Sequence, residues 1–353
     1  VGEGADELAS HAGEVIPVIK QTQKLSQCIY TPILSDNSYF KDTFIIEVER
    51  GCANRCGFCL ASYLNLPLRA VPENEIYNAI DLGLKYTDKI AFLGAEVSAH
   101  PKFQEICNYI KEKLKHKNFE MNFSSLRVDA ISEDVVSTLH IAGQRNLTLA
   151  IEAGSDSLRK FINKNVSNKQ IFEAAKIIKK CGLKGIKIYG MIGIPTETQQ
   201  DIEEIVNIAK ILKKENLEIS FGFSTFVPKA HTPFQWFGRE DTKSLERKCN
   251  FLQKELHKLG IQVSISSPKW DYWQAVLSRG DGSFTEFLID TYKNGGKLGA
   301  FKAAAKKYNI DTDYYALKDY DYNQSLPWDF IYIKPQKEFL IQESKRLKSY
   351  RGL

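Results

Sequence analysis

Three cysteines, each able to bind a metal as its thiolate, lie within eight residues of one another. Cys52, Cys56 and Cys59 form the pattern C-x3-C-x2-C in the stretch EVERGCANRCGFCLAS. Three thiolates on one short loop can bind three irons of a [4Fe–4S] cubane and leave the fourth iron open, whereas an electron carrier saturates all four irons with cysteine. A structural zinc ion is the alternative, but zinc takes a closed set of four ligands, and the next Cys or His along the chain is His100. The pattern favours a cluster with an open iron.

The whole chain has the composition of an ordinary globular protein. Its 353 residues are 43% hydrophobic and 26% charged, which excludes a wholly disordered or fibrous protein. The net charge of +5 is too weak to argue for nucleic-acid binding by itself. No apolar run approaches the roughly 20 residues that span a bilayer, and the first residues do not form a signal peptide. We therefore expect a cytoplasmic location and, because position 1 is Val, a chain that is processed, trimmed or a fragment.

The cysteine loop follows the first of several short β-rich runs that alternate with longer amphipathic segments. Ser132 and Ser167 precede two of these segments and are suitable helix N-caps. The spacing leaves room for one helix after each strand, which predicts six β/α units and a parallel sheet, as either a barrel or a doubly wound sheet. The expected strands begin near Phe44, Lys89, Phe119, Asn146, Gly185 and Leu217, and the expected helices cover 73–86, 103–114, 133–142, 168–181, 198–214 and 242–259.

Two flanks depart from this repeat. Residues 1–43 lack a clear periodicity and are interpreted as a leader or linker, and the repeat with its connecting segments occupies 44–265. Residues 266–353 are rich in aromatic side chains, with six of the 16 Tyr between Tyr308 and Tyr332. We expect this tail to be a smaller, mainly helical extension.

From Phe44 to about Pro228 the chain resembles the radical S-adenosylmethionine (SAM) superfamily, whose hallmark is the C-x3-C-x2-C spacing with an aromatic residue, here Phe58, before the last cysteine. The resemblance implies an α/β fold, a partial (β/α)6 barrel with its active site at the carboxyl ends of the strands. It also implies a [4Fe–4S] cluster that cleaves SAM reductively to a 5′-deoxyadenosyl radical. The electron would come from a low-potential donor of the flavodoxin or ferredoxin type.

The same resemblance assigns SAM contacts to residues at the strand ends. Gly94, Ala95 and Glu96 lie where the family has Gly-Gly-Glu and holds the amino group of SAM, with Ala as a departure from that pattern. Glu152, in AIEAGSDS, matches a polar residue that binds the ribose. Further candidates are Ser124 and Arg127 for the ribose or the carboxylate of SAM, Lys164 for the carboxylate, and Ile192 and Gly193, in GMIGIPTE, for the adenine.

Within the superfamily, the chain is similar to the subgroup with an N-terminal cobalamin-binding domain. The opening VGEGADELAS is similar to the end of that domain, although the cobalt-ligating pattern D-x-H-x-x-G does not occur in this sequence. The resemblance therefore adds cobalamin as a cofactor of a longer protein, with methyl or radical transfer as its reaction. His231 follows the sixth strand and is a candidate acid or base, or a histidine that only structures its loop.

Two other classes of function remain open. A non-catalytic iron–sulfur electron carrier would need the cysteines but no nucleotide site at the strand ends. An RNA-binding or RNA-modifying module is suggested by Lys111, Lys113, Lys115 and Lys117, although such a run more often forms a solvated helix face.

Overall fold

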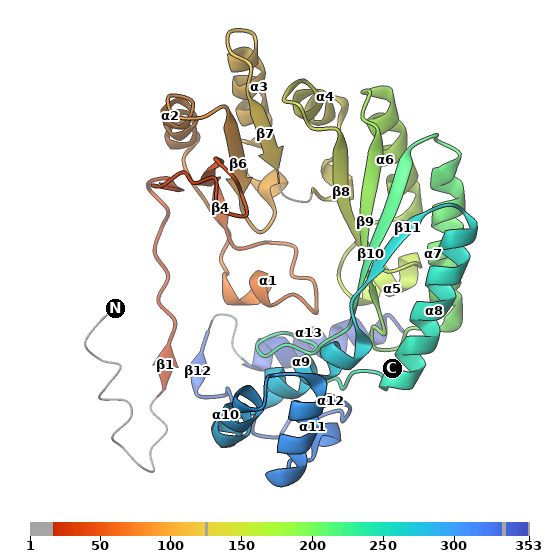
Figure 1. The fold of residues 1–353 in the computed structure, drawn as a ribbon. Coiled ribbons are helices and arrows are strands. Elements are labelled where there is room, and N and C mark those ends of the chain that lie inside the picture. Colours follow the sequence, from red (N-terminus) through yellow and green to blue (C-terminus); the bar gives the residue numbers. More distant parts are fainter. Residues whose placement is uncertain (1–16, 124–125, 334–336, 352–353) are drawn as a thin grey trace.

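The computed structural model describes residues 17–123, 126–333 and 337–351. Seven parallel strands form an open barrel made of two sheets, which Figure 1 shows facing one another. A single parallel bridge between Leu126 and Leu149 joins the two sheets. The first sheet has the order β2-β3-β6-β7 and the second β8-β9-β10-β11, and only β2 runs antiparallel to its neighbour. The strands are β2 Ile29–Tyr30, β3 Phe44–Glu47, β6 Lys89–Leu93, β7 Glu120–Phe123, β8 Asn146–Glu152, β9 Gly185–Ile192, β10 Glu218–Thr225 and β11 Gln262–Ile265.

The expected repeat of six strands, each with a covering helix, is confirmed. The strands begin within one residue of the predicted positions, and Ser132 and Ser167 cap helices as expected, Ser167 in a capping box with Gln170. The strand β11 was missed because it is only four residues long and its sequence QVSI has no apolar run. The covering helices are α2 Glu73–Gly83, α3 Phe103–Leu114, α4 Glu133–Ile141, α6 Asn168–Lys180, α7 Gln199–Lys213 and α8 Thr242–Lys258.

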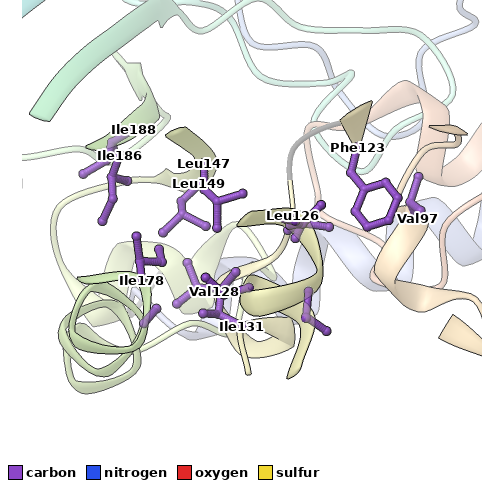
Figure 2. Close-up of a cluster of buried hydrophobic side chains, with 14 of the residues drawn as sticks. Val97, Phe123, Leu126, Val128, Ile131, Leu147, Leu149, Ile178, Ile186 and Ile188 are labelled. Atoms are coloured by element: carbon purple, nitrogen blue, oxygen red, sulfur yellow. The ribbon is translucent and has the colours of Figure 1, made fainter. Parts of the chain in front are cut away.

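The main core lies between the strands and these helices. In Figure 2, Leu147 and Leu149 of β8 and Ile186 and Ile188 of β9 point toward Ile178 of α6. Successive side chains of a strand point to opposite faces. The residues between these apolar ones, such as Tyr189, therefore face the interior of the open barrel.

The remaining elements lie at the carboxyl ends of the strands. The short helices α1 Leu60–Leu64 and α5 Asp156–Phe161 follow β4 and β8, and the C-terminal extension lies at the same end of the barrel (Figure 1). The extension has its own core around Trp273 and Phe287. Its helices are α9 Pro268–Arg279, α10 Thr285–Lys293, α11 Leu298–Lys307, α12 Thr312–Ala316 and α13 Lys337–Ser349, with a three-residue 3-10 turn at Gly282–Phe284. Two further 3-10 turns, Val97–Ala99 and Val128–Ala130, belong to the barrel.

The leader pairs with both parts of the chain. Strand β1 (Val18–Ile19) runs parallel to β12 (Ile331–Tyr332) in the extension, and β2 adds an antiparallel edge strand to the barrel. Within the described ranges, no helix combines the length and the apolar character needed to cross a membrane.

Candidate functional site

The three cysteines lie on an excursion between β4 (Glu49–Arg50) and β5 (Arg69–Ala70), which pair as an antiparallel ribbon. Gly51 starts the excursion with a φ of +92°, a left-handed conformation that glycine adopts without strain. A Cβ atom there would lie 2.4 Å from the carbonyl oxygen of Asn65. The ribbon therefore brings the two ends of the loop together, and the glycine permits the close approach.

A turn after α5 fixes the shape of the loop. The N–H of Gly57 donates to the carbonyl oxygen of Ile162 at 2.9 Å. The side-chain amide of Asn163 donates to the carbonyl oxygens of Asn54 at 2.9 Å and of Arg55 at 3.0 Å. Asn163 itself has a φ of +58°, which asparagine tolerates better than most residues. Sequence reasoning missed this residue because the helix before it, α5, was not predicted.

Aromatic and aliphatic side chains pack against one side of the cysteine loop. A Cβ atom on Gly57 would lie 2.8 Å from Cδ1 of Leu347 and 2.9 Å from Cε1 of Phe234. Both side chains are fully buried in one cluster, and Phe58 packs against it while remaining half-buried. Helix α13 of the extension thus contacts the cysteine loop directly.

The thiols of this loop suit a cluster. Cys52 and Cys56 are buried, and Cys59 is partly exposed. Burial raises the pKa of the Cys56 thiol to about 12, while the nearby cations Lys164 and Arg127 oppose that shift. No three His, Cys, Asp or Glu side chains of the described residues converge on one metal ion. A cubane takes one thiolate for each of three irons, and the loop supplies three.

At the end of β6, a buried carboxylate lies beneath the turn of residues 94–96. The N–H of Glu96 donates to Oε1 of Glu49 at 2.8 Å. A Cβ atom on Gly94 would lie 2.4 Å from the same oxygen. The other oxygen, Oε2, is buried and has no hydrogen-bond partner within the described part of the chain. Burial raises the pKa of the Glu49 carboxyl and that of the Glu96 carboxyl. Glu49 was not predicted, because the run FIIEVE contains two acids, Glu47 and Glu49, and the sequence does not show which of them is buried.

Glu152 and Lys164 form a buried ion pair. Nζ of Lys164 lies 3.4 Å from Oε1 of Glu152, and the two side chains are 9% and 15% exposed. Glu152 has a φ of +67° next to a register shift in β8, so it leaves the regular strand. Arg127 donates to both carboxylate oxygens of Asp129 at 2.9 Å and to the carbonyl oxygen of Lys164 at 3.2 Å. These side chains surround the cysteine loop at the strand ends.

Three other candidates have different positions. Ile192 is fully buried in the core between β9 and the helices, so its side chain cannot face a ligand inside the barrel, and that expectation is corrected. Gly193 has a φ of +76°, and its N–H donates at 2.7 Å to Glu197, which also pairs with Lys248 at 3.0 Å. Ser124 lies outside the described residues.

His231 does not join the strand-end set. It lines a separate cavity of about 340 Å³ with residues of the extension such as Trp328 and Asp329. Its backbone N–H donates to Gln235 at 2.8 Å, and burial lowers the pKa of its imidazole. This position fits the alternative that His231 structures its loop better than a role among the strand-end side chains.

The four lysines at the end of α3 and just after it each contact a neighbouring group. Lys111 contacts Asp134 at 3.3 Å, Lys113 contacts Asp81 at 2.7 Å, Lys115 contacts Glu112 at 2.6 Å, and Lys117 donates to a backbone carbonyl. These contacts fit a solvated helix face better than a nucleic-acid surface.

Comparisons with known proteins agree with this site. The sequence profile of the radical SAM superfamily matches residues 46–209. An uncharacterized protein of Methanocaldococcus jannaschii, MJ0966, is 34% identical over 272 residues, which are 76% of this chain and 59% of that protein. A tRNA-2-methylthio-N(6)-dimethylallyladenosine synthase of Thermosipho africanus is 25% identical over 67% of this chain and 57% of the enzyme. The chain thus spans less than two thirds of the length of these relatives.

Among solved structures, the radical SAM methyltransferase TsrM of Kitasatospora setae matches 54% of this chain and 38% of its own, with a TM-score of 0.45 and 13% identity. The profile match covers the cysteine loop and the strand ends that surround it. Residues 46–209 therefore form a radical SAM domain, and the members of that superfamily are enzymes built around a [4Fe–4S] cluster and S-adenosylmethionine.

Proposed function

We propose that this chain binds the cluster through Cys52, Cys56 and Cys59 and cleaves SAM reductively. The observation that carries the proposal is the position of the three cysteines. They lie on one loop held by hydrogen bonds, next to buried charged side chains at the strand ends. When bound and reduced, the cluster supplies one electron, which breaks a carbon–sulfur bond of SAM and yields methionine and a 5′-deoxyadenosyl radical.

In this proposal the polar groups of the strand ends hold the parts of SAM. The turn of Gly94, Ala95 and Glu96 binds the ammonium group, and the unpartnered oxygen of Glu49 gives a second acceptor for that cation. A buried carboxylate without a partner is costly, and a bound ammonium group would offset that cost.

We assign the binding of the ribose and of the carboxylate of SAM to the ion pair of Glu152 and Lys164. Glu152 can accept hydrogen bonds from two ribose hydroxyls, and Lys164 supplies the positive charge for the carboxylate. Arg127, held by Asp129, orients Lys164 through its carbonyl oxygen. Phe58 and Gly193 remain sequence-based candidates for SAM contacts, and Ser124 remains one for the ribose.

The test is the formation of 5′-deoxyadenosine. Anaerobically reconstituted protein is given SAM and dithionite, and the nucleoside and methionine are measured by mass spectrometry. We expect equal amounts of both, and neither from the Cys56→Ala variant. A reduced, iron-replete sample that forms no 5′-deoxyadenosine would contradict the proposal and favour an electron carrier. In the cell, a flavodoxin or ferredoxin in the cytoplasm would take the place of dithionite.

We further propose that the whole protein transfers a methyl or methylthio group to a base of RNA. The support is similarity to relatives named as a tRNA-2-methylthio-N(6)-dimethylallyladenosine synthase, a threonylcarbamoyladenosine tRNA methylthiotransferase and an uncharacterized methyltransferase. Cobalamin use stays a proposal from the resemblance of the first ten residues, which lie outside the described ranges. Cobalamin added to a longer form of the protein, with absorption spectroscopy as the readout, tests that part.

A further inference from the structure

The inner face of β9, β10 and β11 differs from the interior of a filled barrel. Filled barrels pack layers of branched apolar side chains inside, whereas the inward positions here are small or polar. A smaller hollow of about 380 Å³ lies along this face, and a larger one of about 790 Å³ lies at the amino ends of these strands, lined by residues such as Leu217, Glu218 and Gly260. The inward side chains are Lys187 and Tyr189 on β9, Ser220 and Ser224 on β10, and Gln262 and Ser264 on β11, with Gly222 between the serines of β10.

An aromatic ring lies across this face. Tyr189 is paired in register with Gly222, and a Cβ atom on Gly222 would lie 2.8 Å from Cε1 of the ring. The absence of a side chain at Gly222 is therefore what lets the ring lie against β10. The Tyr189 side chain is 41% exposed although it faces the barrel interior. A planar group could stack on this ring by displacing the Lys187 ammonium group, which lies over it.

Polar groups surround the ring. The smaller hollow is lined by Tyr189, Ser224, Ser264 and Ser266, and it reaches Glu152. The hydroxyls can donate to and accept from the edge of a heterocycle. The ammonium group of Lys187 lies 4.9 Å from the centre of the Tyr189 ring and continues into the larger hollow. Lys213 also lines that hollow, so two lysines and one acidic residue, Glu218, are among its lining residues.

We infer that this face is the substrate surface, with Tyr189 as the stacking platform for a nucleobase of single-stranded RNA and Lys187 as a contact to its backbone. The inference rests on the proposed RNA substrate and names the residues that would recognise it. Single-stranded nucleic acids bind to proteins through aromatic platforms next to basic groups. The hollow reaches Glu152, so the stacked base would lie next to the proposed ribose site of SAM.

Binding is measured by fluorescence anisotropy of a labelled oligoadenosine RNA, independently of catalysis. Tyr189→Ala should weaken binding by about 5- to 150-fold, the range that loss of one base–aromatic stack gives. Tyr189→Phe keeps the ring and should stay within about threefold of the wild type. Tyr86→Ala, at a tyrosine that is 71% exposed on the other sheet's side of the molecule, is the matched control and should have no effect.

Two further measurements separate the explanations. An oligonucleotide with abasic sites should bind wild-type protein more weakly than oligoadenosine, and the Tyr189→Ala variant should no longer distinguish the two. SAM affinity of that variant should stay within about twofold of the wild type. A variant that loses SAM affinity but keeps RNA affinity would assign the ring to the adenine of SAM and overturn the inference. If the wild type forms no 5′-deoxyadenosine, that result contradicts the proposed function. The inference that Tyr189 stacks on a nucleobase is then decided by the RNA-binding measurement.

Discussion

The contact between the cysteine loop and helix α13 allows a double-mutant test. Gly57→Ala adds a methyl group that would lie 2.8 Å from Leu347 and 2.9 Å from Phe234. Gly57 does not have a left-handed φ, so the backbone accepts alanine and the cost is overpacking, about 1–3 kcal/mol. Leu347→Ala empties a fully buried position and should cost about 2–5 kcal/mol.

The double variant should be more stable than the sum of the single changes predicts. The shortened side chain at 347 makes room for the methyl group at 57, so a favourable coupling of about 1–2 kcal/mol is expected. The free energy of unfolding is measured by urea denaturation of the apoprotein, and iron content after reconstitution is measured in parallel. Gly57→Ala alone should lose iron, and the double variant should regain part of it.

The matched control combines Gly57→Ala with Leu340→Ala, since Leu340 is equally buried on α13 but belongs to a different cluster. Those two changes should be additive. If the pair at 57 and 347 is also additive, or if iron content does not follow the coupling, α13 does not position the cysteine loop and the reasoning is refuted.

Three other outcomes are expected. Reconstituted protein should show a broad absorption at about 400 nm that dithionite bleaches, and replacing any one of Cys52, Cys56 and Cys59 with Ala should abolish it. Stoichiometric zinc in anaerobically purified protein would contradict the cluster. Lys164→Ala should weaken SAM binding by about tenfold or more, because it removes a buried charge-assisted contact and leaves Glu152 unpaired, and calorimetry that finds unchanged affinity would exclude its role. Arg351→Ala should lower the unfolding free energy by about 1–3 kcal/mol, because its guanidinium donates at 2.8 Å to the buried carboxylate of Asp201, and an unchanged urea midpoint would show that the contact contributes nothing.

Much of this protein follows from local sequence. The C-x3-C-x2-C spacing identifies the cluster loop because three ligands on one short segment need no distant residue. The six strand starts and the capped helices follow from periods of about 2 and 3.6 residues and from N-cap chemistry, which act over a few neighbours. The edge strands β2 and β11 have only two and four residues, too few to establish a period, so tertiary pairing decides them.

Only the tertiary structure decided which groups meet. The resemblance made Lys164 a candidate for the carboxylate of SAM, but only the turn after α5 brings it against Glu152. Ile192 lies in a motif-like segment, but the register of β9 turns its side chain to the helices. Glu49 and Tyr189 became notable through an oxygen without a partner in the described chain and through a ring lying over Gly222. Such features depend on register and on contacts between residues far apart in the chain, and the local pattern of a sequence does not encode them.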